Sequence, residues 1–170
     1  MKAQKKHQYI LEQAYKVFIK KGYSQVTMTD IITECEISRG GVYRYFQSTK
    51  DIFIALVRQM NLQKSERNFS TFIEYLEHEK TELLNIRKTI RVAGYEFMIQ
   101  ESQTDNNSIA REIYESNIKI ILKLTDFNQK QAEQTFLILE GLTAMALTGI
   151  LTTELIKNHF DYIINMARKI

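Results

Sequence analysis

The chain contains no proline and only six glycines among its 170 residues. Sheet proteins need tight turns, and turns depend on these two residue types, so the composition argues against a β-rich fold. The single cysteine, Cys35, has no second cysteine as a partner and fits a reducing compartment. The composition therefore predicts an all-α fold. We see no secretion signal, so we expect the protein to be cytoplasmic.

Patterns that support catalysis or metal binding are also scarce. The three histidines, His7, His78 and His159, are scattered, and no ligand spacing links them. There is no phosphate-binding loop and no serine, histidine and acid arrangement. Glu140 interrupts the most apolar stretch, which argues against a membrane span. We therefore expect no enzyme activity, no cofactor, no metal and no membrane partner.

Charge, by contrast, is unevenly distributed. Residues 1–50 carry nine Lys or Arg against four Asp or Glu, a net charge of +5, whereas residues 51–170 carry fourteen against sixteen, a net charge of −2. A basic N-terminal third on a nearly neutral body is typical of a nucleic-acid-binding head.

The segment from Thr27 to Phe46, TMTDIITECEISRGGVYRYF, predicts two short helices joined by a tight turn. Thr27 can cap the first helix, with Asp30 favouring its N-terminus, and Ser38 can cap the second. Val42 and Phe46 are spaced to anchor the second helix to the body. The residues left facing outward are basic, aromatic or small, which indicates contact with DNA: Arg39, Gly40, Gly41, Tyr43, Arg44 and Tyr45.

Glu36 lies in the turn between the two helices. A left-handed conformation there would cost a non-glycine residue roughly 1–2 kcal/mol. We therefore expect the turn to be built in another way.

Helical periodicity continues to the end of the chain. A first helix runs to Lys21 and is ended by Gly22, and a fourth begins near Ser48 or Thr49. The remaining predicted helices cover Phe69–Glu79, Glu82–Glu101, Ile109–Leu124, Gln129–Leu151 and Thr153–Lys169, with a loop at Gln103–Ser108. We divide the chain into a helix-turn-helix domain, residues 1–47, and a helical domain, residues 48–170.

The last two predicted helices are apolar on two faces, which predicts burial on both. One face can meet its own domain, and the other needs a partner; a four-helix bundle of two subunits satisfies both. The alternative is a larger monomeric core. We assign to the dimer interface Phe136, Leu139, Thr143, Ala146, Ile150, Ile156, Phe160, Ile163 and Ala167.

Gly22, the start formed by Thr27, Thr29, Asp30 and Ile31, and the run SRGGVYRYF resemble the N-terminal signature of TetR/AcrR-type transcriptional regulators. The resemblance covers about the first sixty residues. It implies an all-helical homodimer with a three-helix DNA-binding head and a C-terminal domain for dimerisation and ligand binding. It also implies a repressor that a small molecule releases from a palindromic operator in double-stranded DNA.

The resemblance implies roles for particular residues. Thr27, Ser38 and Tyr43 would contact phosphates, and Arg39 would reach base edges. Arg44 is a second candidate for bases and Tyr45 for phosphate. Lys50 would lie against the DNA backbone, with Thr49 or Gln47 as alternatives. Lys2, Lys5 and Lys6 could add non-specific attraction as an N-terminal arm.

A ligand site is harder to predict, because aromatic residues line pockets and also fill ordinary cores. We select as candidates Phe69, Phe72, Tyr95, Met98, Tyr114, Phe136 and Glu140. They would suit a small apolar or cationic effector, with a carboxylate to neutralise the charge. A helical protein-interaction adaptor without DNA binding is the alternative function.

Overall fold

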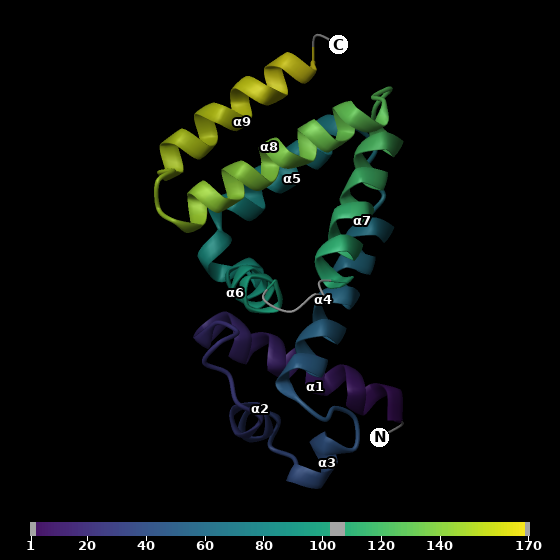
Figure 1. Cartoon of the computed structure of the whole chain (residues 1–170), viewed down its shortest axis with the longest axis vertical. Helices are drawn as coiled ribbons and strands as arrows, with labels where there is room; N and C mark the ends of the chain where they lie inside the picture. The colour runs from purple at the N-terminus through teal and green to yellow at the C-terminus, as the bar shows by residue number, and fades with distance from the viewer. Residues whose placement is uncertain (1–2, 103–107, 169–170) are drawn as a thin grey trace. The chain divides into compact units, whose positions relative to one another are not determined.

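The computed structural model describes residues 3–102 and 108–168. These described residues form nine α-helices and one short 3₁₀ helix, with no strand among them, which confirms the all-α prediction (Figure 1). The elements are α1 (Ala3–Lys21), α2 (Met28–Cys35), α3 (Arg39–Tyr43), α4 (Thr49–Glu66), α5 (Phe72–Leu84), η1 (Ile86–Lys88), α6 (Arg91–Glu101), α7 (Ser108–Leu124), α8 (Gln129–Leu147) and α9 (Thr153–Ala167). None of the described helices is long and apolar enough to cross a membrane.

Two compact units make up the chain. The first contains Met1–Leu62 and Ile90–Ile109, and the second contains Gln63–Thr89 and Ala110–Ile170. The predicted division after residue 47 differs from this, because most of α4 and all of α6 pack with the helix-turn-helix. The sequence gives no signal for this return of the chain to its N-terminal unit.

The first unit is built from an amphipathic α1 that buries Ile10, Ala14 and Phe18 completely. Lys20 and Lys21 occupy its last turn, where their positive charges interact favourably with the negative end of the helix dipole. Gly22 follows with a φ of 76°, a left-handed conformation that stops the helix, as expected.

The turn between α2 and α3 differs from our expectation. Glu36 ends α2 with a φ of 52° and a ψ of 31°, and its N–H donates to the carbonyl of Thr33. The chain therefore uses the left-handed turn even though a non-glycine residue occupies it, and it carries the associated strain.

The second unit contains α5, α8 and α9 as neighbouring helices, together with α7 and η1 (Figure 1). Tyr75, Leu76, Ile121 and Phe160 are almost fully buried in its core. Thr71, Asn128 and Thr152 cap α5, α8 and α9 through their side-chain oxygens. These caps define the helix starts, since each satisfies an N–H that has no partner within the helix.

Several predicted helix bounds change. α5 begins at Phe72 and runs to Leu84, beyond the predicted end at Glu79. The predicted helix Glu82–Glu101 is divided, because α5 ends at Leu84, the 3₁₀ helix η1 follows, and α-helical geometry resumes only at Arg91 in α6. α8 ends at Leu147 rather than at Leu151. Most of the predicted loop Gln103–Ser108 lies outside the described residues.

Candidate nucleic-acid interface

We call residues 38–46 the recognition segment. It contains the five residues of α3 and the residues on either side of it. The Ser38 hydroxyl accepts a hydrogen bond from the N–H of Gly41 at 3.2 Å, which confirms the predicted cap. Val42 is fully buried and Phe46 nearly so, and these two side chains hold the segment against the rest of its unit. α3 is therefore fixed by one cap and two anchors, and the rest of its surface stays available.

Arg39 and Tyr43 lie together on that surface. The Arg39 guanidinium is 5.3 Å from the centre of the Tyr43 ring, a cation–π contact that spans one helical turn. Arg39 and Arg44 are exposed, and Tyr43 is half-buried. The ring orders the arginine side chain, so less freedom is lost when its donors meet an acceptor.

Tyr45 is also half-buried and contacts α1. Its ring centre lies 6.3 Å from that of His7, which in turn lies 4.7 Å from Phe46. His7 thus joins α1 to the end of the recognition segment.

The two glycines of α3 differ in their surroundings. A Cβ atom on Gly40 would meet nothing within 4 Å, so this position is open. A Cβ atom on Gly41 would lie 3.1 Å from the Ser38 hydroxyl and 3.3 Å from the Lys6 ammonium. Lys6, predicted as part of a terminal arm, therefore belongs to α1 and lies beside α3. Lys2 lies outside the described residues.

Thr27 caps α2 in a reciprocal arrangement with Asp30. The Asp30 N–H donates to the Thr27 hydroxyl at 3.2 Å, and that hydroxyl donates to the Asp30 carboxylate at 2.8 Å. Lys21 pairs with the same carboxylate at 2.6 Å, and its hydrogen bond, with those from Thr27, lowers the pKa of Asp30 to about 2. Because the Thr27 hydroxyl already donates to an anion, a phosphate contact requires it to exchange partners.

Lys50 lies in the first turn of α4 and pairs with Glu101 at the end of α6. The ammonium nitrogen is 2.5 Å from a Glu101 carboxylate oxygen. Of the alternatives, Gln47 donates to the carbonyl of Tyr43 at 2.8 Å, and Thr49 is half-buried as the first residue of α4. Sequence reasoning missed Glu101, which no local pattern connects to Lys50.

Cys35 is buried at the end of α2, and its carbonyl accepts a hydrogen bond from the Tyr9 hydroxyl at 3.1 Å. Burial and the nearby charge of Glu34 raise the pKa of its thiol to about 11. A thiol in this state is a poor nucleophile at neutral pH and packs as a small apolar side chain.

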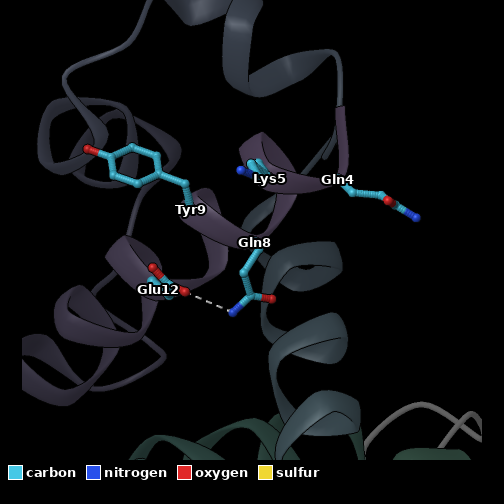
Figure 2. Close-up of a pocket in the computed structure, with 5 residues that line it drawn as sticks. All are labelled: Gln4, Lys5, Gln8, Tyr9 and Glu12. Carbon is cyan, nitrogen blue, oxygen red and sulfur yellow. Dashed lines mark hydrogen bonds between the residues drawn. The ribbon is translucent and has the colours of Figure 1, made fainter. Parts of the chain in front are cut away.

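An open hollow of about 450 Å³ lies along one face of α1 (Figure 2). Gln4, Lys5, Gln8, Tyr9 and Glu12 line it, and Gln8 donates to Glu12 at 3.0 Å. None of the candidate ligand residues lines this hollow.

The candidate ligand residues are distributed over both units. Tyr95 and Met98 belong to α6 in the first unit. In the second unit, the ring centres of Tyr114 and Phe136 lie 5.4 Å apart in an edge-to-face contact. Burial, followed by a hydrogen bond to the Glu133 carboxylate, raises the pKa of Tyr114.

The other ligand candidates of the second unit contribute to packing or lie at its edge. Phe69 is buried against Tyr75, and Phe72 contacts Tyr75 and Phe127. Glu140 is half-buried on α8.

The predicted dimer residues need correction. Six of them are buried inside their own subunit, where a second subunit has no access: Phe136, Leu139, Thr143, Ala146, Ile156 and Phe160. Ile163 and Ala167 pack partly against the same core, and only Ile150 is exposed. The sequence shows that α8 has two apolar faces, and the predicted interface residues lie on the face that turns inward.

Exposed apolar side chains follow the other faces of α8 and α9. On α8 they are Leu137, Ile138 and Met145, and on α9 they are Leu155, Tyr162 and Met166. Gly141 and Ala144 are also exposed on α8, and their small size would let another helix approach closely. The sequence predicts two apolar faces on this helix, and Ile138 and Met145 belong to the one that turns outward.

Together these observations define an all-helical protein whose N-terminal unit contains a helix-turn-helix. The model of the family described as bacterial regulatory proteins, tetR family, matches residues 10–56, the part of the chain that forms it. The helix-turn-helix part of the chain is therefore of the tetR-family type.

Two curated relatives from Bacillus subtilis (strain 168) are similar to the chain. The uncharacterized HTH-type transcriptional regulator YfiR is 32% identical over 99 residues, which cover 53% of this chain and 48% of the relative. The uncharacterized HTH-type transcriptional regulator YuxN is 36% identical over 52 residues, 31% of this chain and 18% of the relative. The chain thus aligns with about half or less of the length of these relatives.

Solved structures resemble the chain over nearly its whole length. The reduced form of E. coli NemR has a TM-score of 0.73 at 14% identity and covers 95% of this chain and 97% of its own. Salmonella enterica GusR has a TM-score of 0.66 at 15% identity, covering 98% and 95%. At this identity the likeness establishes the fold.

Proposed function

We propose that the protein is a transcriptional regulator that binds double-stranded DNA in the cytoplasm. The observation that carries this proposal is the ordered, exposed Arg39 on a helix that buries only Val42. A short helix that exposes arginines and half-exposes tyrosines gains little from its own fold, and such side chains suit the edges and backbone of a duplex.

Each side chain has a role in the proposed complex. Arg39 offers a planar pair of donors to a guanine edge in the major groove, with Arg44 as a second base contact. Ser38, Tyr43 and Tyr45 present hydroxyls to phosphates, and the open Gly40 allows close approach of the backbone. Gly41 has no side chain either, but Ser38 and Lys6 lie close to it. Lys6 and Lys50 add charge that attracts the phosphates.

A homodimer would place two such segments on one operator. The exposed apolar rows on α8 and α9 would pair with the same rows of a second subunit, because pairing removes them from water. Two recognition segments then meet successive major grooves about 34 Å apart, which favours a palindromic operator.

Repression and release by a small molecule complete the proposal. Among structures of this fold, NalD of Pseudomonas aeruginosa is described as the secondary repressor of an efflux pump, and FrrA as a flavonoid-responsive regulator. By analogy, we propose a small apolar or cationic effector near Tyr114, Phe136 and Glu140. It would act through different affinities for two conformations of the dimer.

Substitution of Arg39 tests the DNA-binding proposal. Arg39→Ala should weaken binding to a duplex selected by the wild-type protein from a random pool by about 1–3 kcal/mol, because a bidentate base contact is lost. The control is Arg87→Ala, which removes an exposed charge from η1. Fluorescence anisotropy at fixed salt measures both.

Two results would count against the proposal. If the wild-type protein selects no duplex and shows no salt-sensitive affinity, the adaptor function becomes the better one. If both arginine variants weaken binding equally, Arg39 contributes charge only and does not recognise bases.

A further inference from the structure

α6 is fastened to the helix-turn-helix unit by an aromatic cluster. Phe97 is buried, and its ring centre lies 5.0 Å from Tyr23 and 5.1 Å from Phe53. Tyr23 lies in the loop between α1 and α2, and Phe53 lies on α4, so one side chain of α6 contacts both this loop and α4. Rings at these distances pack as a rigid group, and this fixes the position of α6 in its unit.

A carboxylate next to Phe97 fixes the helix further. Glu96 accepts hydrogen bonds at 3.0 Å from both the backbone N–H and the hydroxyl of Ser24. A Cβ atom on Gly22 would lie only 2.6 Å from an oxygen of the same carboxylate. These contacts tie α6 to the loop between α1 and α2.

Glu101, five residues further along α6, meets Lys50 on α4. Only 13% of the Glu101 side chain is exposed, against 44% of the Lys50 side chain. The carboxylate is therefore held by the protein, whereas the ammonium can still reach solvent. Glu101 is also the last residue of α6, where the negative end of the helix dipole adds to its attraction for a cation.

Lys50 lies four residues after Phe46, in the first turn of α4. A lysine in this place attracts DNA phosphates, but its positive charge is already compensated by Glu101. Binding a phosphate requires the ammonium to share or leave the carboxylate, and the free energy of the ion pair is then subtracted from the free energy of DNA binding.

We propose that Glu101 competes with the DNA phosphate backbone for Lys50, so that α6 lowers the DNA affinity of the first unit, to which it belongs. This proposal rests on the proposed function, because it assumes that the unit binds DNA. The Lys21–Asp30 pair differs in kind, since Asp30 belongs to the cap of α2.

The test is a double-mutant cycle on Lys50 and Glu101 in the full chain. Glu101→Gln keeps the shape of the side chain and removes its charge. We expect it to raise affinity for a duplex selected by the wild-type protein about two- to fivefold for each subunit, the range that a partly exposed ion pair supplies. In a Lys50→Gln background the same change should have no effect, because the ammonium for which Glu101 and the phosphates compete is absent.

Asp51→Asn is the matched control for general repulsion between carboxylates and DNA. Asp51 is exposed and lies beside Lys50 in the first turn of α4. We expect this change to raise affinity less than Glu101→Gln does, and by the same factor with or without Lys50. Melting curves of every variant check folding. Glu101→Asp, which keeps the charge but shortens its reach, should give an intermediate affinity.

Several results would overturn the proposal. Unchanged or reduced affinity in Glu101→Gln would show that Glu101 does not compete or that it positions Lys50 for DNA. An equal gain in the Lys50→Gln background, or in Asp51→Asn, would show general charge repulsion. In these cases wild-type binding still stands and only this inference fails; absence of any DNA binding by the wild-type protein removes both.

Discussion

α3 and α8 balance exposure and burial in opposite ways. α3 has five residues, buries only Val42 and presents polar and aromatic groups to solvent. α8 has 19 residues, buries five and still exposes Leu137, Ile138 and Met145. A helix held by a cap and a few anchors can offer a polar surface for DNA. α8 is apolar on two faces, and the core covers only one of them. The apolar face that stays exposed favours association with another chain.

The contrast between the two faces of the second unit gives the largest expected effect. Phe160 is fully buried on α9, whereas Tyr162, two residues later, is 66% exposed. Phe160→Ala should lower the free energy of unfolding by about 3–5 kcal/mol, because it leaves a cavity in the core. Tyr162→Ala leaves no such cavity. Chemical denaturation measures both losses.

The two variants should also differ in their dependence on protein concentration. If Tyr162 lies in a dimer interface, its removal weakens self-association, and stability then increases less with protein concentration than it does in the wild-type protein. Analytical ultracentrifugation measures the association directly. Equal losses of subunit stability in the two variants would contradict the separation of an inner and an outer face.

A second effect contrasts the two glycines that adopt left-handed conformations. Gly22 has a φ of 76° and faces the Glu96 carboxylate, whereas Gly149 has a φ of 78° and faces open space. Gly149→Ala should cost about 1 kcal/mol of stability from backbone strain alone. Gly22→Ala should cost about 2–3 kcal/mol, because the new methyl group also displaces Glu96 from Ser24.

Thermal unfolding of both glycine variants checks this difference. The comparison shows how much the contact between α6 and the first loop contributes beyond the strain that both positions share. Equal destabilisation would mean that Glu96 moves aside at no cost and that α6 is held by the aromatic cluster alone.

Local chemistry explains how much of the fold could be predicted from the sequence. The caps at Thr27 and Ser38, the stop at Gly22 and the anchors Val42 and Phe46 each involve residues a few positions apart. A sequence contains all the information for such features, so the helix-turn-helix and its exposed residues follow from it.

Features that depend on distant residues could not be predicted. Glu101 meets Lys50 and Glu96 meets Ser24 across 51 and 72 positions of the chain. The inner face of α8 is decided by which helices pack against it, and both of its faces are apolar enough to be buried. The break at Asn85 has no proline or glycine to mark it. These are packing decisions, which local patterns do not specify.

The smallest effect concerns the turn between α2 and α3, where Glu36 adopts a conformation that suits glycine better. Glu36→Gly should raise the free energy of unfolding by about 1 kcal/mol, because glycine adopts the left-handed conformation without strain. This value already allows for the entropy that glycine adds to the unfolded chain, which opposes the gain. Glu34→Gly makes the same change inside α2, where it should instead lower stability by about 1 kcal/mol. Opposite signs in urea denaturation would show that backbone conformation, rather than loss of a carboxylate from the recognition unit, determines the result. Destabilisation by both variants would mean that the Glu36 side chain contributes more than its strained backbone costs.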